Sequence, residues 1–463
     1  MGLLLPLFRD EGWWARFVVQ HGPVREGLGI VISGWILEAT KWDVRYDSLW
    51  VSSVLLLAAM LALRVKWKMT GTIGLRDSWI PLFCMSLGQF ETVLSVPQAA
   101  HSVVPLALIL LAANVWLSPR PSVRYLGSAT AGVMLTYTGF GLFAGGGIAV
   151  LLVARAVRHA LEGERRMMWL AAVGVAMSAA GWSVFLKGYA FSPAVDDFRF
   201  PWDPWTDYVR FVLLMLCLPT GEIGDRLPHY VLGSALALVV GVVAARIAWV
   251  WAKHRPSLKD DVLVLLMASG LLFVAATAVG RVSIGPLGGT ASRYLSLMVP
   301  MWLAVYFAAA MSRRKMLELA ALVCLGVLTF PPYVSILRRP LSDWPGTVGM
   351  THSALDAVMH YGTGKAAWAD AYLSSGSWEA AGAAVRQPIH PNPEGSDFDA
   401  KLRFLRERKL SFFAGDPGRG DYMPWLADDR FRRIVTAQMK AKIGAGDGDR
   451  TRDIELGKLA FYR

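Results

Sequence analysis

Repeated apolar runs close to the length of a bilayer span constrain this chain more than any other feature. A helix needs about 20 predominantly apolar residues to cross the hydrocarbon core. Backbone inside lipid must satisfy its own hydrogen bonds, so such runs are expected to be helical. About ten runs qualify: 47–64, 78–96, 98–117, 123–137, 140–156, 168–187, 229–251, 262–280, 294–311 and 316–333. The sequence therefore predicts an all-α polytopic membrane protein, with a re-entrant or interfacial helix at 208–221.

Composition agrees with this class. Hydrophobic residues make up 54% of the chain, more than soluble domains usually carry, and its 19 Trp suit membrane–water interfaces. The net charge of +12 arises largely in short loops between apolar runs, so it indicates membrane topology and not a nucleic-acid partner. The three Cys lie in apolar segments without metal-binding spacing and are interpreted as packing residues.

Basic residues predict the orientation. Four loops rich in Arg and Lys alternate along the chain as expected if all four face the cytoplasm. They are marked by Arg64, Lys66, Lys68 and Arg76, by Arg155, Arg158, Arg165 and Arg166, by Lys253, His254, Arg255 and Lys259, and by Arg313, Arg314 and Lys315. The loops 188–206 and 281–293 then lie at the outer face, as does everything after Arg338.

The chain divides into three predicted parts. Residues 1–46 form a juxtamembrane segment, in which the apolar run Gly27 to Ala39 is too short to span and is expected along the outer surface. Residues 47–336 form the transmembrane domain. Residues 337–463 lack long apolar runs and are expected to form a small mixed domain on the outer face. If Gly27 to Ala39 crossed the membrane instead, the first residues would be cytoplasmic.

Four groups of polar residues on the predicted outer face are candidates for chemistry. The first contains Asp10, Glu11, His21, Arg25 and Glu26, which fits either a general base beside a membrane-bound substrate or an ordinary solvated helix start. The second group interrupts an apolar run. A carboxylate in lipid needs a partner or water, so this group marks either a functional site or a turn at the membrane surface. Its members are Gln89, Glu91, Gln98 and His101.

The third group is the acidic, aromatic loop 196–208, whose composition suits sugar binding or a plain interfacial loop. The fourth places Arg281, Arg293 and Tyr294 around a Gly-rich loop. Arg forks match phosphate oxygens, and Arg is disfavoured outside, so these side chains bind either a lipid phosphate or an internal carboxylate. There is no P-loop, HExxH, GxSxG or paired CxxC sequence, and Gly145 to Gly147 suit close helix packing.

Three stretches carry a resemblance to a known class: PLFRDEGWWARFVVQHGPVREGLG, SLGQFETVLSVPQ and GRVSIGPLGGTASRY. They resemble the first outer loop, a Gln- and Glu-containing segment ahead of a spanning helix, and a late Gly-rich loop of bacterial polytopic membrane proteins related to the GT-C glycosyltransferases, which use lipid-phosphate-linked sugars. The resemblance spans roughly residues 5 to 310. In that class a first transmembrane helix precedes a large outer loop that carries the catalytic carboxylate. The resemblance therefore places residues 1–46 outside and implies that a first helix precedes Met1.

By this resemblance, Asp10 or Glu11 is the expected catalytic base and Arg293 contacts the donor phosphate. His21, Arg25, Glu91, Arg281 and Tyr294 complete the expected substrate- and lipid-phosphate-binding set. The expected partners are membrane lipid and a polyprenyl-phosphate-linked sugar donor at the outer face of the cytoplasmic membrane. No cofactor is expected, since the histidines lack helical metal spacing. The alternatives are a transporter or lipid flippase, and a non-enzymatic membrane assembly component.

Overall fold

The computed structural model describes residues 12–41, 44–89, 92–93, 99–192, 198–221, 224–253, 256–312, 315–338, 374, 403–404 and 406–409. Two compact units divide the chain, one of residues 2–36 and 44–335 and the other of residues 1, 37–43 and 336–463. The first unit contains nearly all of the described residues and is helical apart from a two-stranded hairpin. Most of the predicted domain at 337–463 lies outside the described residues.

The helical unit begins with α2 (Trp13–Val18), the strands β1 (Gln20–His21) and β2 (Val24–Arg25), and α3 (Gly27–Ala39). The α-helices that follow are α4 (Val44–Thr70), α5 (Trp79–Cys84), α7 (Val104–Trp116), α8 (Ser128–Thr136), α9 (Gly141–Leu161), α10 (Arg165–Leu186), α11 (Thr206–Cys217), α12 (Leu227–Lys253), α13 (Leu258–Arg281), α14 (Leu295–Met311) and α15 (Lys315–Arg338). Short 3₁₀ and π turns join several of them, including Ala99–Val103 before α7 and Ser292–Tyr294 before α14.

Six helices in the described part of the chain are long and apolar enough to cross a membrane: α4, α9, α10, α12, α13 and α14. This finding confirms a mostly helical protein and supports the membrane class, with six candidate spans in the described part of the chain where ten were expected. The run 78–96 ends its first helix at Cys84, and the run 123–137 forms a π turn followed by the nine residues of α8. Three shorter apolar helices cover Gly27–Ala39, His101–Trp116 and Glu318–Val334. The 13 residues of α3 rise about 20 Å, less than the roughly 30 Å of a bilayer core.

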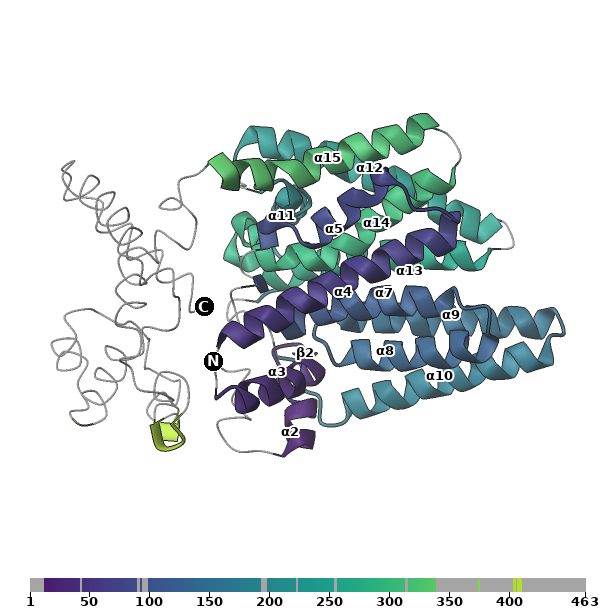
Figure 1. Ribbon diagram of the computed structural model, residues 1–463, viewed down its shortest axis with the longest axis horizontal. Helices are drawn as coiled ribbons and strands as arrows, with labels where there is room; N and C mark the ends of the chain where they lie inside the picture. Colours follow the sequence, from purple (N-terminus) through teal and green to yellow (C-terminus); the bar gives the residue numbers. More distant parts are fainter. Residues whose placement is uncertain are drawn as a thin grey trace. The chain divides into compact units, whose positions relative to one another are not determined.

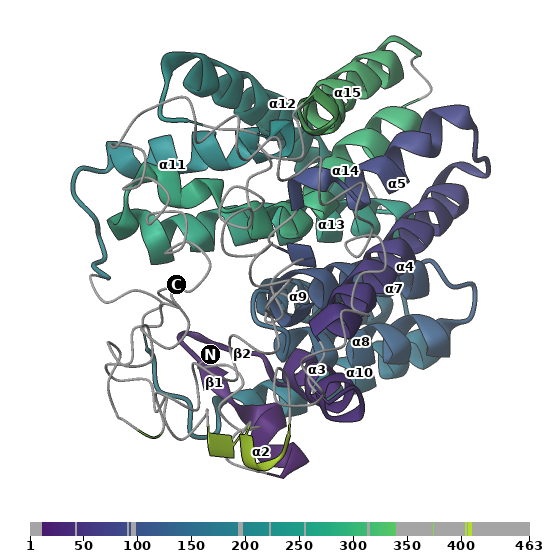
Figure 2. The same ribbon diagram turned by 60° about the vertical axis from the view of Figure 1, so that its left-hand side comes forward.

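The core is centred on α14. In its most apolar window 78% of the residues are buried inside the protein, against 22% for α12. Helix α14 packs against α13, α7 and α4, while α8, α9 and α10 form a second layer that meets α13 through α9. These layers are visible in Figures 1 and 2. Gly145 lies so close to α8 that a Cβ would meet the Gly132 carbonyl at 2.7 Å, which confirms the predicted packing role for this glycine.

The basic turns meet at one end of the bundle. Lys259 at the start of α13 donates to the Met69 carbonyl near the end of α4 at 2.5 Å, and Arg158 of α9 donates to the Pro256 carbonyl at 3.2 Å. Lys66 pairs with Asp77 at 2.9 Å. Tyr306 near the end of α14 also donates to Asp77, at 2.7 Å. The described parts of all four loops therefore share one end, as the alternating charge pattern predicts.

Candidate functional site

The β1–β2 hairpin is held at the opposite end of the bundle by Arg25. This side chain is 5% exposed. Its Nε donates to the Phe185 carbonyl at 2.8 Å and one terminal nitrogen donates to the Lys187 carbonyl at 2.7 Å. The other terminal nitrogen donates to the Val18 carbonyl. The last carbonyls of a helix lack intrahelical donors and carry partial negative charge, so Arg25 caps the end of α10 and fastens residues 18–25 to it.

Replacing Arg25 by Lys is expected to lower the free energy of unfolding by about 1–3 kcal/mol, because an ammonium group cannot reproduce a fork that reaches three carbonyls. Unfolding of the purified protein in detergent micelles, followed by tryptophan fluorescence, measures the change. Arg246→Lys, on an exposed position of α12, is the control. Equal stability of the two variants would contradict the anchoring role.

The hairpin places Glu26 beside His101. The Glu26 side chain is completely buried, and its Oε1 lies 2.9 Å from Nδ1 of His101, which keeps 17% of its side chain exposed. The turn between α8 and α9 fixes this pair, since the Gly139 amide donates to the Arg25 carbonyl at 2.9 Å and Leu28 donates to the Tyr137 carbonyl at 3.2 Å. Gly139 has φ +62°, and a Cβ there would lie 3.4 Å from His101 Nδ1. Glycine therefore suits both the backbone and the space.

The geometry of the pair assigns different roles to its two members. With Nδ1 facing the carboxylate, Nε2 of His101 points away from Glu26 and is available to accept a proton. A buried carboxylate at Nδ1 fixes the imidazole tautomer and stabilises the imidazolium. Both carboxylate oxygens of Glu26 are buried and neither makes a hydrogen bond within the described residues, so the 2.9 Å approach of Oε1 to His101 Nδ1 is an ion-pair contact without hydrogen-bond geometry. Such an unsatisfied carboxylate oxygen costs stability, and sites of this kind are more typical of function than of packing.

His21 lies next to this pair. Its ring centroid is 6.1 Å from that of His101, in an edge-to-face arrangement. Desolvation among the neighbouring atoms lowers the pKa of His21, although one side of the residue remains exposed. After burial, the carboxylate of Glu26 has the next largest effect and raises this pKa, while the neighbouring His101 and Arg281 lower it. Burial therefore favours the neutral form of His21, which can both donate and accept hydrogen bonds.

A row of aromatic rings leads from His101 to the predicted arginines. The row runs from His101 through Phe140 and Phe273 to Tyr294, with centroid separations of 6.4, 5.1 and 5.8 Å. Arg281 and Arg293 both lie over Tyr294, 5.8 and 5.5 Å from its centroid. The Tyr294 hydroxyl is buried without a hydrogen-bond partner in the described structure. Two cations and an unused hydroxyl thus gather at the far end of the row.

The predicted site residues fall into three sets. The fold brings together His21, Arg281, Arg293 and Tyr294, while Arg25 is committed to the scaffold. Asp10, Glu11 and Glu91 lie outside the described residues, as do Gln98 and the first carboxylates of the loop 196–208. Gln89 is buried and accepts from Ser296 at 2.5 Å, which ties the chain after α5 to α14. Asp207 accepts from Trp202 at 3.3 Å, a contact within its own loop.

The central pair of the site could not be predicted as a pair. Glu26 and His101 each stood in a candidate group, but 75 positions separate them and no spacing rule links them. Their signal in the sequence is a polar side chain at the edge of an apolar run.

No known protein family, curated protein or solved structure matches this chain. The geometry of the site is therefore the basis for assigning a function.

Proposed function

We propose that this polytopic membrane protein is a glycosyltransferase that moves a sugar from a polyprenyl-phosphate donor to an acceptor hydroxyl. The observation that carries the proposal is the contact between the buried Glu26 carboxylate and His101, from which a row of packed rings leads to Tyr294 beneath Arg281. A general base and a cation at one end of a membrane bundle suit an amphipathic phosphate-linked substrate. The GT-C-like stretches of the sequence support the same class.

In the proposed reaction, the oxygen of the acceptor hydroxyl attacks the anomeric carbon of the donor sugar. The bond from that carbon to the phosphate oxygen breaks, and its electron pair stays on the phosphate. Nε2 of His101 takes the hydroxyl proton, while Glu26 holds the ring and stabilises its positive charge. Asp10 and Glu11, one of which is the catalytic base expected from the resemblance, precede the described residues, and that expectation stays a prediction.

Arg281 and Arg293 are proposed to hold the donor phosphate. Guanidinium groups bind phosphate oxygens through paired hydrogen bonds and stabilise the charge that develops on a leaving phosphate. Both groups lie over Tyr294, whose buried hydroxyl offers a further donor. Phe273 and Tyr294 are buried, so the row of aromatic rings links the His101 end of the site to the arginine end by packing.

The orientation follows from the charges. The basic turns lie at the other end of the bundle, and by the positive-inside tendency they face the cytoplasm. The site is then at the outer face of the cytoplasmic membrane. Proton-coupled transport is the competing function, since buried Glu and His also relay protons. Transporters, however, usually bind near the membrane midplane at broken helices, whereas Glu26 precedes α3 and His101 precedes α7 at their ends.

Replacing Arg281 by Gln is expected to raise the KM for the polyprenyl-phosphate donor by about tenfold or more, because a charge-assisted phosphate contact is worth about 1.5–3 kcal/mol. The test uses membranes from cells with and without the protein and a radiolabelled polyprenyl-phosphate sugar. Arg246→Gln on the exposed face of α12 is the control. No transfer above membranes that lack the protein would contradict the proposed activity. An unchanged KM in Arg281→Gln would contradict only the phosphate role.

A further inference from the structure

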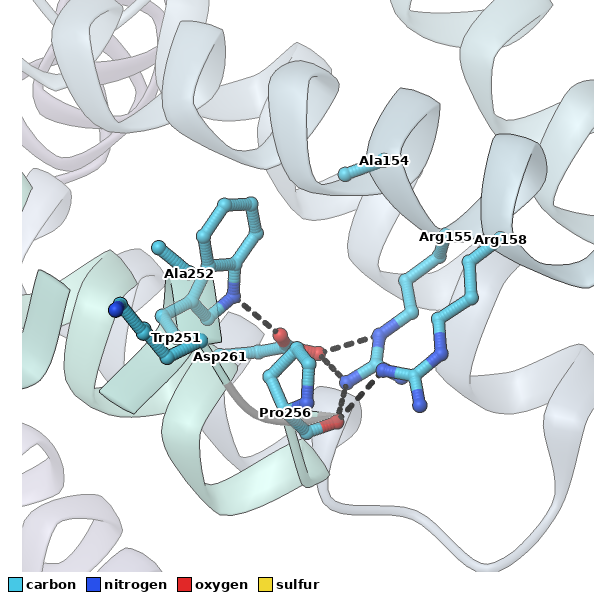
Figure 3. Close-up of a pocket in the computed structure, with 8 residues that line it drawn as sticks. Ala154, Arg155, Arg158, Trp251, Ala252, Pro256 and Asp261 are labelled. Carbon is cyan, nitrogen blue, oxygen red and sulfur yellow. Dashed lines mark hydrogen bonds and ion pairs between the residues drawn. The ribbon is translucent and has the colours of Figure 1, made fainter. Parts of the chain in front are cut away.

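A second polar cluster lies at the basic end of the bundle, far along the helices from the proposed transfer site. It surrounds an open cavity of about 390 Å³ between the last turns of α9 and α12 and the first turn of α13 (Figure 3). Ala154, Arg155, Arg158, Trp251, Ala252, Lys253, Pro256 and Asp261 line this cavity. The lining contains three cations and one carboxylate, and Glu162 beside the lining pairs with Arg158 at 3.0 Å, so the net charge is small and positive.

Asp261 belongs to the wall of the cavity and is not available to a cation. Its carboxylate is 1% exposed and accepts from Arg155 Nε at 2.7 Å, from Trp116 at 2.9 Å and from Trp251 at 3.0 Å. A second Arg155 nitrogen also contacts it. A carboxylate has about four acceptor positions, so these donors saturate it and cancel the charge of Arg155. Asp261 therefore positions the Trp251 and Arg155 side chains around the opening.

The other two cations retain donors for a ligand. Arg158 donates once to the Pro256 carbonyl and once to Glu162, at 3.2 and 3.0 Å, out of five N–H groups. Lys253 is exposed, and its ammonium lies 4.2 Å from the Trp249 ring centroid. These cations come from opposite walls of the cavity. Figure 3 shows Arg155 and Arg158 directed from α9 toward Pro256 and Asp261.

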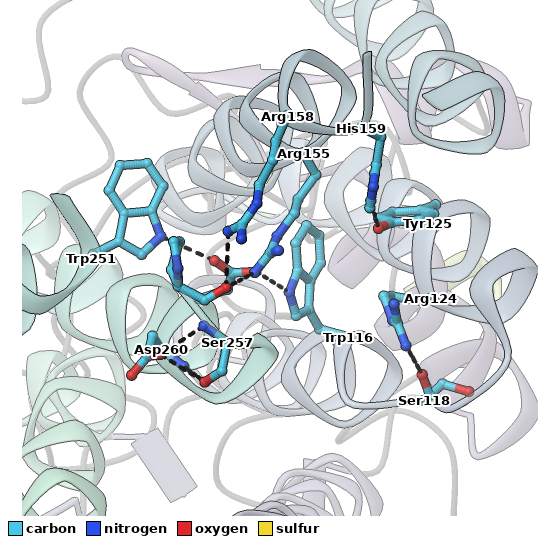
Figure 4. Close-up of polar contacts among 12 residues, drawn as sticks. Trp116, Ser118, Arg124, Tyr125, Arg155, Arg158, His159, Trp251, Ser257 and Asp260 are labelled. Carbon is cyan, nitrogen blue, oxygen red and sulfur yellow. Dashed lines mark hydrogen bonds and ion pairs between the residues drawn. The ribbon is translucent and has the colours of Figure 1, made fainter. Parts of the chain in front are cut away.

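The floor of the cavity is held rigidly. The Ser257 hydroxyl accepts from the Asp260 amide at 3.3 Å, and the Asp260 carboxylate accepts from the Ser257 amide at 2.8 Å. This capping box begins α13 and fixes the Pro256 carbonyl that orients both arginines (Figure 4). A preorganised set of cations costs little additional entropy when an anion binds.

The position of the cavity indicates where its ligand comes from. It lies where two candidate spans end, among tryptophans of the kind that mark the membrane–water boundary. Phosphate headgroups lie at this depth, and basic pockets between helices on the cytoplasmic side bind them. The flanking helices also expose apolar side chains along their length, including Val153 and Val157 of α9 and Val242 and Trp249 of α12. Such surfaces suit acyl chains.

We propose that this cavity binds the phosphate group of an anionic phospholipid. Arg158 and Lys253 contact the phosphate, and Asp261 acts as a positioning residue through Arg155 and Trp251. The proposal does not depend on the activity at the other end of the bundle. It predicts that the protein retains an anionic lipid more tightly than a zwitterionic one of the same chain length.

The experiment measures binding of phosphatidylglycerol and phosphatidylcholine to the purified, delipidated protein by native mass spectrometry. Arg158→Gln combined with Lys253→Gln is expected to weaken phosphatidylglycerol binding about tenfold or more, toward the phosphatidylcholine level. The control combines Arg166→Gln with Arg246→Gln, which removes two exposed charges from α10 and α12 and is expected to change binding by less than about twofold. Thermal unfolding of each variant verifies that it is folded.

Two results would overturn the proposal. Equal weakening in the pocket and control variants would assign the effect to general surface charge. If phosphatidylcholine bound as tightly as phosphatidylglycerol, the cavity would not select an anionic headgroup, which contradicts the proposal. Inorganic phosphate, added as a competitor, distinguishes the source of the phosphate. If inorganic phosphate displaces the lipid when both are present at the same concentration, the cavity binds a soluble phosphate and the lipid proposal is contradicted. Retention of the lipid supports the proposal.

Discussion

The Glu26→Gln variant is expected to transfer sugar about 10²–10⁴-fold more slowly than the unchanged protein, with little change in the KM for the donor. An amide at this position can donate to Nδ1 of His101 and so favour the wrong tautomer, in which Nε2 carries the proton. The same amide cannot stabilise an imidazolium. The loss therefore belongs to the chemical step, since Glu26 is completely buried 2.9 Å from His101 and does not meet the substrate.

The control for this prediction is Glu38→Gln, which removes an exposed carboxylate from the same helix, α3. Rates are measured with labelled donor at saturating concentration, and folding is followed by unfolding in micelles. A parallel variant, His101→Gln, is expected to lose as much activity as Glu26→Gln, and the double variant to lose little more, because the two side chains act as one unit. Independent, multiplying losses would contradict the proposed dyad.

The Asp261→Asn variant is expected to lose about 3–5 kcal/mol of unfolding free energy. The asparagine amide would face the donors of Arg155, Trp116 and Trp251, and Arg155 would remain as a buried charge without its counterion. Asp261 joins α13 to α7, α9 and α12, so its loss loosens four helices at the basic end. Figure 3 labels Asp261 with Arg155 and Trp251, and Figure 4 labels Trp116 beside Arg155.

Unfolding in micelles titrated with a denaturing detergent, followed by tryptophan fluorescence, measures this loss. The comparison is Asp260→Asn, which weakens only the exposed cap of α13 and is expected to cost about 0.5–2 kcal/mol. A double variant, Arg155→Met with Asp261→Leu, is expected to recover most of the stability, since no unpaired charge remains. A loss in Asp261→Asn no larger than in Asp260→Asn would contradict the structural role of this ion pair.

Apolar length predicted the long helices well because lipid leaves the backbone few choices. The helices α4, α9, α10, α12, α13 and α14 all fall on predicted runs. The same criterion failed for the runs 78–96 and 123–137, because segments enclosed by other helices need neither spanning length nor lipid-facing surface. Tyr125, for example, is fully buried although it lies in a π turn.

The candidate site was predicted in part. The alternation of basic loops correctly predicted that His21, Arg281 and Arg293 lie at one end of the bundle. Loop charges follow membrane topology, so they predict the end at which a loop lies but not which side chains meet there. The pairing of Glu26 with His101 depends on the α8–α9 turn and on the strands β1 and β2, which have two residues each and no readable periodicity. Arg25 was predicted to bind substrate, yet its charge suits three backbone carbonyls equally well, and only the fold distinguishes these roles.

The central claim is that the Glu26–His101 pair performs transfer chemistry. The most direct measurement is the release of polyprenyl phosphate from a defined, labelled donor by the purified protein in liposomes. The account predicts that the protein and its Glu38→Gln variant release polyprenyl phosphate, while Glu26→Gln does not. Movement of intact donor across the bilayer without cleavage would contradict it in favour of a transporter. If the protein neither cleaves nor moves the donor but still binds membrane partners, the result would contradict the transferase claim and favour an assembly component.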